Sequence, residues 1–150
     1  MYTREEASQV RRNFWTSFGQ YMKPIRSAEG ETVNWLNYKT GVRHLYFRMD
    51  AEKKMSSVAI EISHPDADQR AFYYNQLSAM KTMLETETAE PWNWEPDVYD
   101  EDGRQISRII IRLPDVNVYN NAHWPQIISF LKPRIIALDR FWATARDLLT

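Results

Sequence analysis

The sequence predicts an α+β fold: a mainly antiparallel sheet of about five strands with helices packed on it. Two observations predict this class. Apolar residues recur at helical spacing near both ends of the chain, and they alternate with polar residues in short segments between those ends. Short connections join several of these segments, which forces neighbouring strands to run antiparallel. The expected order is a helix, three strands, a helix, two strands and one or two helices, in a single domain over residues 1–150.

The first helix is expected to run from Thr3 to the proline at position 24. Thr3 can cap the helix, and Glu6 stands three residues later, as a capping box requires. Phe14 and Phe18 follow at a step of four residues and lie on one apolar face. Pro24 then ends the helical pattern.

Five segments have the composition or the alternation of β-strands. They are residues 33–38, 42–49, 57–63, 92–99 and 105–113. Gly41 suits a hairpin connection between the first two, because glycine tolerates a positive φ. Pro96 lacks the N–H that a central strand would use, so the fourth segment is expected to be an edge strand or a bent one.

The remaining helices are marked by prolines. The second helix is expected to begin at Pro65, which is tolerated in a first turn, and to fade between Thr86 and Thr88. The last third of the chain is expected to be helical from Pro125 onward. Pro133 cannot donate to the preceding turn, so it either kinks one helix or starts another.

Composition excludes several kinds of site. The chain has no cysteine, which removes disulfides, thiol nucleophiles and thiolate metal ligands and fits a cytoplasmic location. No apolar run approaches the ~20 residues that a membrane span needs, so no membrane partner is expected. The three histidines are far apart in the sequence, and the four glycines are scattered. We therefore expect no metal site and no cofactor.

One pair of carboxylates is a candidate for catalysis. The expected element order resembles the core order of the PD-(D/E)xK nucleases, in which acidic residues bind a divalent metal. Asp50, at the end of the second expected strand, and Glu61, on the third, could supply two such ligands. However, Ser63 stands two residues after Glu61, where that superfamily has lysine. A degenerate metal-dependent nuclease is therefore an alternative hypothesis, and the sequence leans against an enzyme.

The first expected hairpin combines aromatic and basic side chains. Aromatic rings can stack on bases while basic residues contact phosphates, so such a surface could bind single-stranded nucleic acid. The candidate binding residues are Trp35, Tyr38, Lys39, Arg43, Tyr46 and Arg48. The net charge of −1 neither favours nor excludes this partner.

The high aromatic content allows a further hypothesis. The sequence has six tryptophans and eight tyrosines among 150 residues. Most of these large side chains are expected to be buried in the hydrophobic core. The same residue types are also enriched at protein interfaces. A protein-interaction or homodimerisation domain is thus a second alternative.

Six short segments spread over the chain carry a resemblance to a known family. They are WLNYKTG at 35–41, VAIEI at 58–62, WE at 94–95, SRI at 107–109, WP at 124–125 and KPRI at 132–135. Together they resemble a bacterial domain-of-unknown-function family with relatives in Bacteroidetes. Members of that family stand alone or form the C-terminal domain of nuclease-like or restriction-associated proteins. The resemblance assigns no catalytic residue. It implies a non-catalytic binding or accessory module linked to nucleic acid or to a nuclease partner, which is the leading hypothesis.

Overall fold

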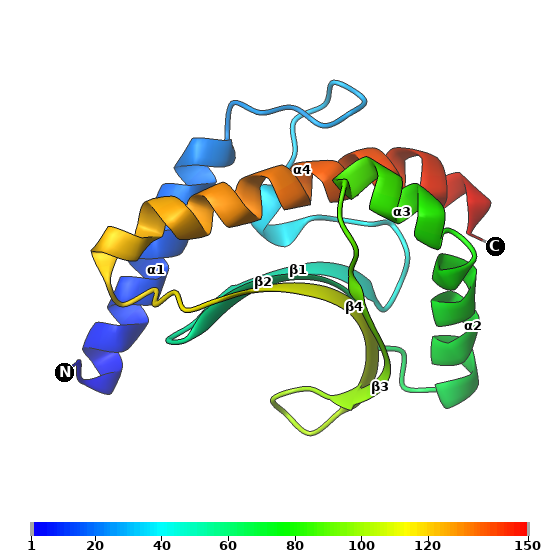
Figure 1. Ribbon diagram of the computed structural model, residues 1–150, viewed down its shortest axis with the longest axis horizontal. Coiled ribbons are helices and arrows are strands. Elements are labelled where there is room, and N and C mark those ends of the chain that lie inside the picture. Colours follow the sequence, from blue (N-terminus) through cyan, green and yellow to red (C-terminus); the bar gives the residue numbers. More distant parts are fainter. Residues whose placement is uncertain (1, 150) are drawn as a thin grey trace.

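A four-stranded antiparallel sheet lies under the helices in the computed structural model, which describes residues 2–149 (Figure 1). The strands, in the spatial order β1-β2-β4-β3, are β1 (Leu45–Ala51), β2 (Met55–Ile62), β4 (Gln105–Pro114) and β3 (Asn93–Tyr99). The α-helices are α1 (Arg4–Met22), α2 (Ala67–Ser78), α3 (Lys81–Thr88) and α4 (Trp124–Leu148), and the short 3₁₀ helices are η1 (Trp35–Asn37) and η2 (Asn121–His123). The described part of the chain therefore confirms a mixed helix and sheet fold, with four strands instead of five.

The long helix α4 runs along one face of the sheet, with α1 and α3 beside it (Figure 1). Phe47, Ile60 and Ile109 are opposite one another in the register and are buried on this face. Tyr46, Glu61 and Arg108 are the next row, and their side chains point the other way because side chains alternate along a strand. Among residues 2–149 no helix lies across that second face, which we call the open face.

The open face is curved, and the turn between β3 and β4 curls back beneath it (Figure 1). Helix α2 stands at the end of the sheet formed by β3 and β4. The start of α2 and the β3–β4 turn both contribute residues to a cleft on this face. No helix among the described residues is long and apolar enough to span a bilayer.

The first helix agrees with its sequence pattern. The Thr3 hydroxyl accepts the N–H of Glu6 at 3.1 Å, and the Glu6 carboxylate accepts the N–H of Thr3 at 3.1 Å, which confirms the capping box. Phe14 and Phe18 are fully buried against the core. Local propensity and the apolar face therefore favour the same helix.

The expected strand at residues 33–38 is wrong. Asn34 caps η1 instead, and its side-chain oxygen accepts the N–H of Asn37 at 3.2 Å. Trp35 is buried, and its Nε1–H donates to the carbonyl of Ile25 at 3.0 Å. The strand-like composition of this segment reflects burial of its aromatic side chains and not pairing in a sheet. Gly41 does have a positive φ, of 81°, but it lies in the loop before β1.

Two further helix boundaries were decided by packing. The expected second helix is divided into α2 and α3 by a break at Ala79 and Met80, where the Met80 side chain is buried. Pro133 lies inside α4, so the last segment is one helix. Pro133 has no N–H, so the carbonyl of Ser129 four residues earlier lacks its usual helical donor. Both residues are exposed, and water can hydrate this carbonyl instead.

Candidate functional site

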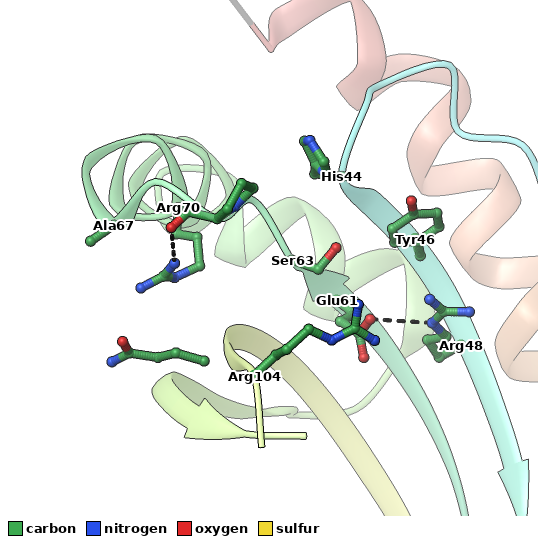
Figure 2. Close-up of a pocket in the computed structure, with 10 residues that line it drawn as sticks. His44, Tyr46, Arg48, Glu61, Ser63, Ala67, Arg70 and Arg104 are labelled. Atoms are coloured by element: carbon green, nitrogen blue, oxygen red, sulfur yellow. Dashed lines mark hydrogen bonds and ion pairs between the residues drawn. The ribbon is translucent and has the colours of Figure 1, made fainter. Parts of the chain in front are cut away.

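A cleft of about 670 Å³ lies on the open face, between β1, β2, the start of α2 and the β3–β4 turn. Figure 2 shows three arginines that reach it from three directions. Arg48 comes from β1, Arg70 from α2 and Arg104 from the β3–β4 turn. Among residues 2–149, Glu61 is the one carboxylate that lines the cleft. The basic side chains therefore outnumber the acidic ones around this space.

Arg70 is the buried member of the set, with 5% of its surface exposed. Its Nη1 donates to the carbonyls of His64 at 2.8 Å and Pro65 at 3.2 Å. Within residues 2–149 no carboxylate forms an ion pair with it. Burial of a charged group without a counter-charge is costly unless another anion balances it. Arg70 is thus preorganised, by its backbone contacts, to accept an anion in the cleft.

The side chains of Tyr46 and Arg48 contact each other on the side of the cleft formed by β1. The Arg48 guanidinium lies 4.5 Å from the centroid of the Tyr46 ring, and its Nε is 3.2 Å from Oε2 of Glu61. Tyr46 itself is 38% exposed. An exposed aromatic ring beside an arginine provides planar groups on which another ring can stack.

Arg104 is the most exposed of the three arginines that line the cleft. Its side chain is 73% exposed and contacts Asp100 at 3.3 Å and Asp102 at 3.2 Å, both within its own turn. Exposed pairs of this kind contribute only ~0–1 kcal/mol, so another anion can replace them. The turn itself is ordered by Asp100, whose Oδ1 accepts the N–H groups of Asp102 and Arg104 at 2.9 Å. These backbone hydrogen bonds, that of Arg104 first, lower the pKa of Asp100.

The six binding residues suggested by the sequence are distributed over different surfaces. Tyr46 and Arg48 line the cleft, and Arg43 is exposed in the loop that precedes β1. Arg43 does not line the cleft, and neither do the other three residues. Trp35 is buried in the core, while Tyr38 and Lys39 line a second cavity of about 400 Å³ beside α4.

A protein-family model described as a domain of unknown function, DUF4268, matches residues 10–146. The chain belongs to the DUF4268 family. The match includes all the residues that line the cleft, and it confirms the expectation of a domain-of-unknown-function family. No curated protein and no solved structure matches the chain.

In the DUF4268 domain, Asp50 and Glu61 share the open face but are not opposite each other. Asp50 pairs with Ser57, whereas Glu61 pairs with Tyr46. Four residues separate these positions along the strand, roughly 13 Å at ~3.3 Å per residue. Arg48 lies between them and binds Glu61. Within residues 2–149 no three histidine or carboxylate side chains converge in a way that could hold a metal ion.

The fold brings two histidines together that are twenty residues apart. The rings of His44 and His64 meet edge to face, with 4.7 Å between centroids, and His44 lines the cleft. Partial loss of hydration lowers the pKa of His44, and the charges of His64 and Arg43 lower it further. The lowered pKa favours the neutral form of His44, which adds an aromatic ring to the cleft.

Carboxylates gather where the β3–β4 turn approaches the end of β1. Loss of hydration raises the pKa of Asp50, and the negative charge of Glu101 raises it further, against the opposing charge of Arg48. Loss of hydration, then Asp50 and Glu101, likewise raise the pKa of Glu52. Glu101 belongs to the β3–β4 turn, which curls back beneath the open face (Figure 1).

Replacing Asp50 by asparagine is expected to stabilise the DUF4268 domain at pH 7–8. Because the pKa of Asp50 is higher in the folded state than in the unfolded state, its ionised form disfavours folding. This penalty is present above the raised pKa and disappears as the pH falls below it. The Asp50 side chain keeps access to solvent, so we expect a gain below ~1 kcal/mol.

Urea unfolding of both proteins at pH 8, 6 and 4 would measure the difference. The gain should shrink as the pH falls. Asp102→Asn is the matched control, because Asp102 is exposed and already paired with Arg104; it should not stabilise. A gain that is the same at all three pH values would contradict the assignment.

The sequence pattern missed Arg70, although it contained a signal. Tyr73, Leu77, Met80 and Leu84 mark the apolar face of the second helical segment. Arg70 precedes Tyr73 by three residues and Leu77 by seven, so it lies on the same face. A charged residue on an apolar face predicts a buried charge. Arg104 carried no comparable signal, because exposed turns commonly contain arginine.

Proposed function

We propose that this domain is a non-catalytic module that binds single-stranded nucleic acid in the cleft. The observation that carries the proposal is Arg70, a buried guanidinium that lines the cleft and has no carboxylate partner among residues 2–149. A phosphodiester supplies the missing negative charge. The planar guanidinium also matches the geometry of two phosphate oxygens, which makes such contacts stronger than those between neutral groups.

Tyr46 favours a nucleic acid over a simple anion. Its exposed ring, backed by Arg48 at 4.5 Å, stands in the same cleft as Arg70. A base can stack on Tyr46 and Arg48 while the neighbouring backbone phosphates contact Arg70 and Arg104. The faces of paired bases are hidden inside a duplex, so stacking on Tyr46 requires an unpaired base.

Fluorescence anisotropy with labelled DNA and RNA single strands of about twelve nucleotides tests the proposal, since such proteins occupy ~4–16 nucleotides. We expect binding that weakens with salt and exceeds binding to a duplex. Arg70→Ala should weaken binding by about tenfold or more, because a hydrogen bond to a charged group contributes ~1.5–3 kcal/mol. Arg104→Ala, which disturbs only exposed contacts, should weaken it by a smaller factor.

The matched control is Arg12→Ala. Arg12 is exposed on α1 and lines a different surface, and the substitution removes the same charge. Tyr46→Ala should weaken binding, whereas Tyr46→Phe should preserve it. No binding at tens of micromolar protein would overturn the proposal. Equal losses for Arg70→Ala, Arg104→Ala and Arg12→Ala would also overturn it, since the cleft would then have no special role.

A further inference from the structure

The cleft continues past Arg70 into a second, smaller chamber of about 320 Å³ between α2 and the β3–β4 pair. Ala67, Arg70 and Gln105 line both spaces. Arg70 therefore stands at the junction. On the proposed function, a phosphate bound at Arg70 would place one neighbouring nucleotide toward Tyr46 and the other toward this second chamber.

The residues that line the chamber suit a planar ring such as a nucleobase. Ala71 gives it a small apolar wall on α2, and Tyr74 adds an aromatic one. Its polar groups come from side-chain amides and from a carboxylate, Asp97. Apart from Arg70 at its entrance, no cationic side chain among the described residues lines it. A phosphate is therefore disfavoured inside the chamber, and a base is the part of a nucleotide that fits its chemistry.

Asp97 lies at an irregularity in the sheet, is exposed and lines the chamber. The register between β3 and β4 shifts between Glu95 and Val98, so Asp97 leaves the regular alternation of the strand. The Ser107 hydroxyl donates to the carbonyl of Pro96 at 2.6 Å and holds this irregular segment. Gln105 Nε2 donates to Asp97 Oδ1 at 2.8 Å. Asp97 Oδ2 accepts no side-chain hydrogen bond from the described residues, and Asp97 Oδ1 keeps a lone pair beyond the one that Gln105 uses.

We infer that this chamber selects guanine, with Asp97 as the residue that determines specificity. The two carboxylate oxygens of Asp97 are neighbouring acceptors, so they match two neighbouring donors on the ligand. Guanine presents N1–H and the N2 amino group side by side, which suit a carboxylate. Adenine and cytosine place an acceptor beside their amino group, and thymine or uracil has one N–H between two carbonyl oxygens.

The test compares oligothymidylates of about twelve nucleotides that carry a single central base change. We expect one guanine to tighten binding roughly tenfold over thymine, the size of one good bidentate contact. Adenine and cytosine should give much smaller gains. Inosine, which lacks the N2 amino group, should lose most of the guanine advantage.

Asp97→Asn should remove the preference for guanine while the affinity for oligothymidylate stays the same or rises slightly. The matched control is Asp68→Asn on α2, which removes an exposed carboxylate that lines neither space; it should keep the preference. Binding of oligothymidylate that depends on Arg70 but gains nothing from guanine would overturn this inference and leave the proposed function standing. Equal gains from all three bases would also overturn it. No binding of any strand would overturn both.

Discussion

Replacing Trp142 by alanine is expected to lower the free energy of unfolding by about 5 kcal/mol, near the upper end for tryptophan in a core. Trp142 is 1% exposed and packs edge to face on Phe47, with 5.8 Å between ring centroids. Its Nε1–H donates to the carbonyl of Thr40 at 2.7 Å. The substitution therefore opens a large cavity and leaves a buried carbonyl without its partner.

This loss is large because a domain is stable by only ~5–15 kcal/mol. Urea unfolding followed by circular dichroism would measure it. Trp142→Phe separates the two contributions: it keeps most of the apolar volume but removes the hydrogen bond, so it should cost about 2 kcal/mol. Tyr21→Ala is the surface control, since Tyr21 is 60% exposed. A loss below about 2 kcal/mol for Trp142→Ala would show that the core rearranges around α4.

Replacing Asp139 by alanine is expected to cost about 3 kcal/mol, because two hydrogen bonds to a charged acceptor are lost. Asp139 lies on α4 and is 5% exposed. Its Oδ2 accepts the N–H of Ala28 at 2.7 Å, and its Oδ1 accepts the hydroxyl of Tyr38 at 2.5 Å. Burial, followed by this hydrogen bond, raises the pKa of Tyr38. The carboxylate thus fastens the long segment between α1 and β1 to α4.

A double-mutant cycle that combines Asp139→Ala with Tyr38→Phe is the control for this prediction. Tyr38→Phe removes one hydrogen bond and should cost about 1–1.5 kcal/mol. The double variant should cost less than the sum of the single variants, because both remove the same contact. Additive losses would mean that Asp139 does not hold Tyr38. Neither residue lines the cleft on the open face, so Tyr38→Phe should leave nucleic-acid binding unchanged.

The segment fastened by Asp139 also explains where prediction from the sequence failed. Aromatic and β-branched residues favour strands, and residues 33–38 contain several. Their side chains are instead held by distant groups, namely Ile25 for Trp35 and Asp139 for Tyr38. Those contacts span up to 101 residues along the chain, and no local pattern records them. By contrast, the alternation in β1 and β2 is local and predicted both strands closely.

For the cleft, local patterns and long-range packing made separate contributions. The sequence by itself determined the capped first helix and the alternating strands that place Tyr46 and Arg48 on one face, because hydrophobic period and capping act within a few residues. Only the tertiary structure decided that Arg48, Arg70 and Arg104 share one space. Their convergence depends on the strand order β1-β2-β4-β3, on the curvature of the sheet and on the position of α2 at its end. These features arise from packing between segments that are distant in the sequence.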